Sequence, residues 1–181
     1  MKPALPKLTF VLGGSRCGKS RFAQELALPK DTKGPKDAVI FWATGTASDK
    51  EMQKRIAEHR KNRPRYWDLL EEPRDLLGGL QKIQAKRARV IVLDSLTTWA
   101  GNIFHRPLKD NPRKHLQAFL HALKKTSNCW IIVSDEVGMG IIPESPMGRS
   151  FKDFLGDANQ SVAAAADAVY FVSAGIPLKI K

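Results

Sequence analysis

The sequence predicts an α/β protein with a mostly parallel central sheet flanked by helices. Short apolar runs bounded by turn residues alternate with segments of helical periodicity, which is the pattern of strand–helix–strand units. The runs are uninterrupted, which is typical of strands buried on both faces of a sheet. The predicted strands are LTFVL at 8–12, VIFWA at 39–43, VIVLD at 90–94, WIIVS at 130–134 and VYFVS at 169–173.

Helical patterns fill the segments between these strands. The expected helices cover 19–28, 48–60, 113–126 and 149–166, and the ending GIPLKIK predicts a short edge strand. Clusters of proline, glycine and charge mark two surface loops, 28–37 and 104–113. No internal repeat divides the chain, so we expect one domain over residues 1–181.

Composition limits the possible classes of protein. The chain has 181 residues, 43% of them hydrophobic, which is enough for one domain with a real core. A net charge of +12 favours polyanionic partners, which include nucleic acid, anionic membranes and nucleotide phosphates. Two cysteines give no disulfide framework, and no apolar segment approaches the ~20 residues of a membrane span. We therefore expect a cytoplasmic protein without a membrane span.

The motif GGSRCGKS at 13–20 carries the most specific chemistry. It fits G-x-x-x-x-G-K-[ST], follows a predicted strand and precedes a helical pattern, which is the context of a P-loop. Backbone N–H groups of such a loop surround phosphate, its lysine reaches the β and γ phosphates, and its hydroxyl contacts Mg²⁺. A glycine-rich turn without a ligand is the alternative. The expected phosphate-binding residues are Gly13, Gly14, Ser15, Arg16, Cys17, Gly18, Lys19 and Ser20.

Polar residues after other strands are further candidates. Asp94 ends the strand VIVLD, where P-loop proteins carry a carboxylate for Mg²⁺ or its waters. The alternative is that Asp94 only caps the following helix. Glu136 is a second-rank candidate for the same pocket, and Thr44, Gly45 and Thr46 follow a strand where they could contact phosphate or base.

A single histidine, His59, lies among arginines and lysines in RIAEHRKNRP at 55–64. Ser48 and Glu51 form a capping box that begins the helix containing it. The spacing from two earlier apolar residues places the imidazole on the apolar face of that helix. Periodicity alone therefore favours a hydrogen-bonded core or boundary histidine, and a solvated face for the neighbouring cations.

The order of the motifs over residues 8–181 resembles one known family. The segments that carry the resemblance are GGSRCGKSRFAQ, ATGTASDKEMQKRIAEHRKNRPRYW, LDSLTTWAGN, SDEVGMGIIPES and FKDFLGDANQSVAAAADAVYFVSAGIPLKIK. They are similar to those of the bifunctional adenosylcobinamide kinase/adenosylcobinamide-phosphate guanylyltransferase family of cobalamin biosynthesis. The resemblance implies a RecA-like P-loop NTPase fold and a homo-oligomer, a trimer.

The same resemblance implies two reactions and the residues for them. One phosphorylates adenosylcobinamide with ATP or GTP; the other transfers GMP from GTP to adenosylcobinamide phosphate through a guanylylated histidine, which falls on His59. Glu58 stands where some members have a second histidine. The implied nucleotide contacts are residues 13–20, Thr44, Gly45, Thr46, Arg60, Lys61, Asn62, Arg63, Glu71 and Asp94. Glu72 is the alternative to Glu71.

Two other functions compete with this one. A RecA-like nucleic-acid-binding ATPase would suit the charge and the P-loop, but the basic residues are not gathered with aromatics into a stacking platform. A kinase that has lost guanylyl transfer is the other alternative, against which the intact His59 speaks. We therefore expect nucleotides and corrinoids as partners, and no nucleic acid.

Overall fold

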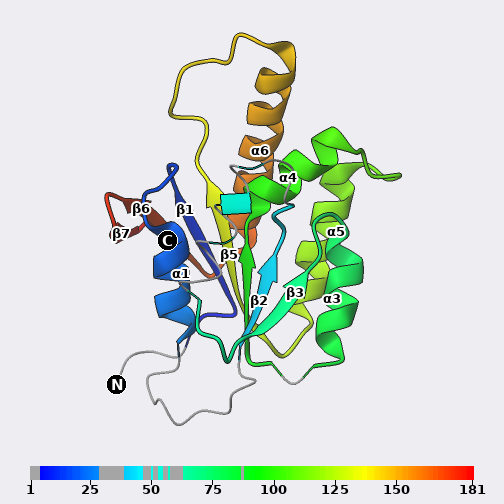
Figure 1. The fold of residues 1–181 in the computed structure, drawn as a ribbon, viewed down its shortest axis with the longest axis vertical. Coiled ribbons are helices and arrows are strands. Elements are labelled where there is room, and N and C mark those ends of the chain that lie inside the picture. Colours follow the sequence, from blue (N-terminus) through cyan, green and yellow to red (C-terminus); the bar gives the residue numbers. More distant parts are fainter. Residues whose placement is uncertain are drawn as a thin grey trace.

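The strands form one twisted sheet in the computed structural model, which describes residues 5–28, 39–46, 50, 53, 54, 57, 63–86 and 88–181. In these residues seven strands lie in the order β3-β2-β4-β5-β1-β6-β7, and only β7 is antiparallel to its neighbour (Figure 1). The mostly parallel sheet predicted from the sequence is confirmed. The strands are β1 (Leu8–Gly13), β2 (Val39–Ala43), β3 (Asp68–Glu71), β4 (Val90–Asp94), β5 (Cys129–Asp135), β6 (Ala168–Ser173) and β7 (Ile176–Lys179).

Helices cover both faces of the sheet, α1 on one face and the other described helices on the opposite face (Figure 1). Each face has its own apolar core, since side chains of a strand alternate between faces. In β1, Phe10 points to the larger core and Val11 to the core beneath α1. The helices are α1 (Lys19–Ala27), α3 (Leu76–Gln84), α4 (Leu96–His105), α5 (Pro112–Lys124) and α6 (Pro146–Ala165).

Sequence signals explain where several helices begin. Asn111 caps α5 by accepting the N–H groups of Arg113 and Lys114, and Pro112 follows at the first helical position. Ser145 caps α6 in the same manner, with Pro146 next. Most of the expected helix at 48–60 lies outside the described residues, as does nearly all of the expected loop at 28–37.

The strand β3 and the helix α3 were not predicted from the sequence. β3 has only four residues, DLLE, and lies half-buried at the edge of the sheet, so it lacks a long apolar run. α3 contains the pair Gly78 and Gly79, which disfavours a helix. Gly79 packs against Trp42, since a β-carbon at this position would lie 2.2 Å from the indole ring. Tertiary packing thus outweighs helix propensity here.

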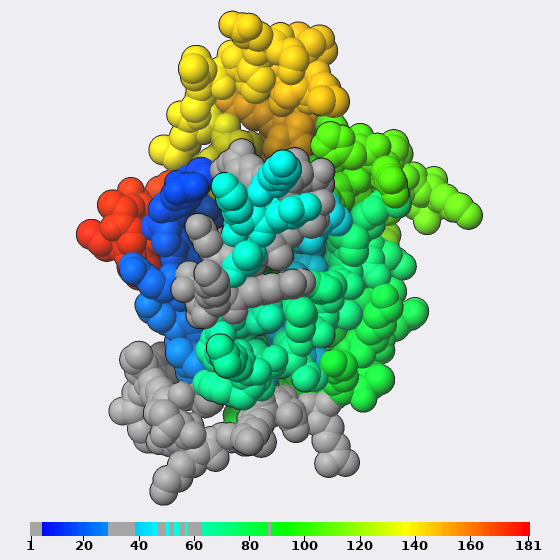
Figure 2. Space-filling view, viewed as in Figure 1, coloured from blue at the N-terminus to red at the C-terminus, as the bar shows by residue number. Residues whose placement is uncertain are grey.

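The carboxyl ends of the parallel strands meet at one edge of the sheet, where an open α/β sheet holds its ligands. Gly13, Thr44, Glu71, Asp94 and Asp135 all lie at or next to these strand ends. The segment 136–145 and the first turns of α6 extend beyond the same edge (Figures 1 and 2). A ligand-binding site is therefore expected at this edge.

Candidate functional site

The loop between β1 and α1 has the backbone of a phosphate-binding turn. Gly18 has a φ of 96°, a left-handed conformation that glycine adopts without a steric penalty, and Arg16 has a φ of 56°. A β-carbon on Gly13 would lie 2.4 Å from the carbonyl oxygen of Val172. Because glycine precedes α1, no cap side chain competes for the first N–H groups of the helix, which attract anions.

A turn near the other end of the chain supports this loop. Gly175, between β6 and β7, donates its N–H to the carbonyl oxygen of Cys17 over 2.8 Å. Gly18 lies so close to Gly175 that an added β-carbon would be 3.2 Å from the Cα of Gly175. Cys17 therefore contributes its backbone carbonyl oxygen to the contact between the two turns.

Lys19 forms an ion pair beside the loop. Its Nζ lies 2.5 Å from Oδ1 of Asp135 and also donates to the carbonyl oxygen of Gly14 over 2.9 Å. Its side chain is only 10% exposed, against 26% for Asp135. The ammonium group is thus held over the loop, where phosphate would lie.

Asp135 was missed by the sequence reasoning, which considered its neighbour Glu136. The deciding fact is register: Asp135 is level with Gly13 in the adjacent strand, so it faces the P-loop lysine. Glu136 instead accepts the N–H of Gly138 over 2.5 Å within its own turn. In the sequence, the apolar strand ends in Ser-Asp-Glu. This pattern indicates a carboxylate at the strand end but does not show whether Asp135 or Glu136 faces the loop.

Hydroxyl and amide groups connect the ends of β2, β4 and the chain before α3. The buried hydroxyl of Thr44 donates to the carbonyl oxygen of Ser95 over 2.7 Å and accepts the N–H of Ser95 over 2.9 Å. Asn102 of α4 donates to the carbonyl oxygens of Thr44 and Pro73 over 2.7 and 3.0 Å. It also accepts the hydroxyl of Thr46 over 3.0 Å. Thr44, Gly45 and Thr46 are therefore held at the strand-end edge.

Asp94 ends β4, as predicted, and it is half-buried. The alternative, that Asp94 caps the following helix, is wrong. Ser95 is the cap of α4: its hydroxyl accepts the N–H of Thr98, and Thr98 reciprocates in a capping box. The cap function therefore does not account for the Asp94 carboxylate.

Oxygen donors suitable for Mg²⁺ are present at this edge. Ser20 lies in the first turn of α1 and is half-buried, and Asp94 supplies a carboxylate. Mg²⁺ in nucleotide sites typically takes one or two protein oxygen ligands, with phosphate oxygens and waters completing its shell. The donor chemistry of Ser20 and Asp94 fits such an ion. The described residues contain no group of three or more His, Cys, Asp or Glu that could hold a metal alone.

The structure separates the two glutamates at the end of β3. Glu72 accepts Lys82 Nζ over 2.8 Å and the N–H groups of Arg74 and Asp75 over 3.3 and 3.2 Å. Burial raises the pKa of Glu72, but these hydrogen bonds outweigh it and hold the pKa below its ordinary value. Glu71 is exposed and level with Ala43 of β2, at the strand-end edge. The role of Glu71 in nucleotide binding stays a prediction.

Of the predicted site residues in the histidine segment, the structure describes Arg63. The Arg63 guanidinium lies 5.0 Å from the ring centre of Phe41 in β2, a cation–π contact. Glu58, His59, Arg60, Lys61 and Asn62 lie outside the described residues. Their roles stay predictions.

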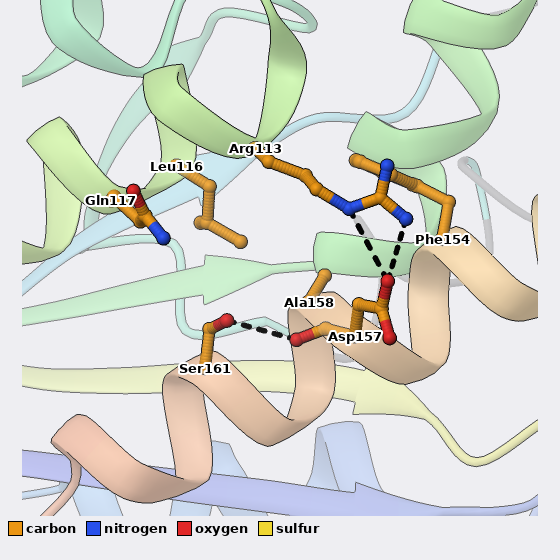
Figure 3. A pocket seen from close by; sticks show the side chains of 7 residues that line it. All are labelled: Arg113, Leu116, Gln117, Phe154, Asp157, Ala158 and Ser161. Atoms are coloured by element: carbon orange, nitrogen blue, oxygen red, sulfur yellow. Dashed lines mark hydrogen bonds and ion pairs between the residues drawn. The ribbon is translucent and has the colours of Figure 1, made fainter.

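A small cavity elsewhere is not a candidate site. It has a volume of about 40 Å³ and lies between α5 and α6, where Arg113 and Asp157 pair across it at 2.6 Å (Figure 3). Ligand pockets usually enclose about 300 Å³ or more. Its other lining residues are Leu116, Gln117, Phe154, Ala158 and Ser161.

Solved structures place this fold in a known class. The chain superposes on the flagellar accessory protein FlaH from Methanocaldococcus jannaschii with a TM-score of 0.57 and 14% identity, covering 99% of this chain and 81% of FlaH. A KaiC-like protein from Pyrococcus horikoshii gives a TM-score of 0.53 and 15% identity, covering 92% and 71%. With the loop at 13–20, the fold is that of a RecA-like P-loop NTPase.

Sequence comparison then identifies the family. The family model described as cobinamide kinase / cobinamide phosphate guanyltransferase matches residues 9–180. The bifunctional adenosylcobalamin biosynthesis protein CobP of Pseudomonas aeruginosa is 37% identical over 94% of this chain and 95% of its own length. CobU of Escherichia coli, also named a bifunctional adenosylcobalamin biosynthesis protein, is 33% identical over 96% and 99%. The chain belongs to this enzyme family.

None of the helices among the described residues is both long and apolar enough to cross a membrane.

Proposed function

We propose that the protein carries out both reactions of its family. It phosphorylates the aminopropanol hydroxyl of adenosylcobinamide with ATP or GTP, and then transfers GMP from GTP to adenosylcobinamide phosphate. The products of the second reaction are adenosylcobinamide-GDP and pyrophosphate. Family membership over nearly the whole chain is the observation that carries this proposal.

The phosphate site supports both reactions. The N–H groups of the loop at 13–20 and the first turn of α1 are donors for triphosphate oxygens, and Lys19 adds a positive charge that is already aimed at the loop. Ser20 and Asp94 would hold Mg²⁺, which when bound neutralises developing charge on the phosphates. Thr44, Gly45, Thr46, Arg63 and Glu71 provide further contacts to the nucleotide.

We infer that His59 is the nucleophile of the second reaction. An imidazole with a pKa near its reference value of about 6.5 is largely neutral at pH 7, so its nitrogen can attack the α-phosphorus of GTP directly. Pyrophosphate leaves as the phosphorus–nitrogen bond forms. Arg60, Lys61, Asn62 and Arg63 follow the histidine and would bind the phosphates. We also propose a homo-oligomer, a trimer, as the assembled enzyme.

Labelling with GTP tests the covalent step. The protein is incubated with α-labelled GTP and Mg²⁺, and the labelled peptide is mapped. We expect an acid-labile, base-stable label on His59. The variant His59→Ala should lose the label and guanylyl transfer while keeping most of the phosphorylation of adenosylcobinamide.

A matched control is His121→Ala, since His121 is exposed on α5. This control should be labelled like the wild type. Absence of label on a wild-type protein that binds GTP would refute the guanylyl-histidine step and favour a kinase without transferase activity. Equal loss of both reactions in a folded His59→Ala protein would contradict the division of labour.

A further inference from the structure

We propose that Asp135 is the general base of the kinase reaction, a role that rests on the function proposed above. Its carboxylate would accept the proton of the aminopropanol hydroxyl as that oxygen attacks the γ-phosphorus. Phosphoryl transfer gains from a residue that orients the acceptor hydroxyl and takes its proton.

Asp135 lies beside the phosphate loop. Asp135 is the last residue of β5, level with Gly13 at the start of the phosphate loop. Its Oδ1 lies 2.5 Å from Nζ of Lys19, the group that reaches the β and γ phosphates in P-loops. An acceptor hydroxyl beside the γ-phosphate would therefore lie next to this carboxylate. The side chain is 26% exposed, which leaves it accessible to a substrate.

The peptide of Asp135 is fixed by side chains from two helices. Its N–H donates to the hydroxyl of Thr97 in α4 over 2.7 Å, and its carbonyl oxygen accepts Nδ2 of Asn159 in α6 over 3.0 Å. Asn159 is only 4% exposed. Two buried or half-buried side chains thus hold one residue at a strand end, which is the support that a positioned catalytic group needs.

Neighbouring carboxylates are worse placed for this role. Glu136 binds the N–H of Gly138 in its own turn. Asp94 ends β4, which is separated from β1 by β5. Asp94 is also level with Val133 of β5. It therefore lies two residues, or about 6–7 Å, short of Asp135 along the strand direction.

The chemistry balances without a further reactant. The hydroxyl oxygen forms a bond to the γ-phosphorus while the bond from that phosphorus to the β–γ bridging oxygen breaks, and the nucleoside diphosphate leaves. The hydroxyl proton moves to the Asp135 carboxylate and later to solvent. Lys19 has three N–H donors, so it can bind phosphate oxygens while keeping Asp135 oriented.

The variant Asp135→Asn tests the role, because it keeps the shape of the side chain and removes the base. Phosphorylation of adenosylcobinamide is measured with γ-labelled ATP and with GTP, and guanylylation is measured separately with α-labelled GTP. We expect the kcat of the kinase to fall about 10²- to 10⁴-fold while the nucleotide KM changes by less than about threefold. Guanylylation should persist, since it needs no acceptor hydroxyl, and it also reports a folded nucleotide site.

The control is Asp68→Asn. Asp68 also pairs with a lysine, Lys86 at 3.0 Å, but at the opposite end of the strands, and this variant should be as active as the wild type. A kinase kcat of Asp135→Asn within about threefold of the wild type would overturn the proposal. So would a change confined to the nucleotide KM, because Asp135 would then only hold Lys19. If the wild-type protein phosphorylates no corrinoid, the proposed function itself is wrong. This outcome is distinct from failure of the Asp135 proposal alone, in which the wild type is active.

Discussion

Two parts of the strand-end edge are held together by different interactions. In the phosphate half, residues 13–20 and Asp135, the decisive contact is an ion pair between Lys19 and a partly exposed carboxylate. In the hydroxyl half, Thr44, Ser95 and Asn102, neutral hydrogen bonds join groups that are mostly buried. The Lys19 ammonium has three N–H donors, so it can bind phosphate in addition to Asp135, whereas buried neutral hydrogen bonds are costly to break. The phosphate half thus has a charged group available to a ligand, and the hydroxyl half has side chains fixed by buried hydrogen bonds.

The largest expected effect is that of Lys19→Ala on the phosphate half. Loss of a charged donor to phosphate should weaken ATP and GTP binding about 10- to 100-fold and lower the kcat of both reactions about 10²- to 10³-fold. Calorimetric titration and steady-state kinetics measure these changes. Lys86→Ala, in the exposed pair with Asp68, is the control and should bind nucleotide normally. Unchanged GTP affinity in Lys19→Ala would show that the phosphate half does not bind nucleotide through Lys19.

In the hydroxyl half we expect loss of stability instead. Thr44→Val removes the acceptor for the N–H of Ser95 and should cost about 1–2 kcal/mol of unfolding free energy. Urea denaturation measures this cost. Thr46→Val, at an exposed hydroxyl, should cost about 0.5 kcal/mol or less. Equal costs for the two variants would show that burial does not distinguish these hydroxyls.

The smallest expected effect concerns Glu72. Its pKa is lower in the folded protein than its ordinary value of 4.5, so its contribution to stability is full above that value and is lost as the pH falls through the folded pKa. Glu72→Gln should destabilise the protein by about 0.5–1.5 kcal/mol at pH 7. The difference from the wild type should shrink in acid denaturation series.

Glu71→Gln is the matched variant for this measurement. We expect it to raise the KM for GTP and to lower the unfolding free energy less than Glu72→Gln does, because Glu71 is exposed. If Glu71→Gln were the more destabilising variant and Glu72→Gln raised the KM for GTP, the two glutamates would have each other's roles.

The sequence was sufficient for the parts of the protein whose signals are local. Five buried strands follow from apolar runs, and the turn at 13–20 follows from its glycine spacing. β3 and α3 could not be predicted, because their stability depends on packing such as that of Gly79 against Trp42. Asp135 could not be chosen over Glu136, because the choice depends on the register between β5 and β1. The single-domain organisation and the roles of the predicted site residues stay predictions.

The contact between Gly175 and Cys17 also bears on how the protein matures. β1 lies between β5 and β6, and the loop after β1 receives a hydrogen bond from the turn after β6. Contacts between segments so distant in sequence form slowly. The loop at 13–20 is therefore complete only once β6 and the turn after it have packed against β1.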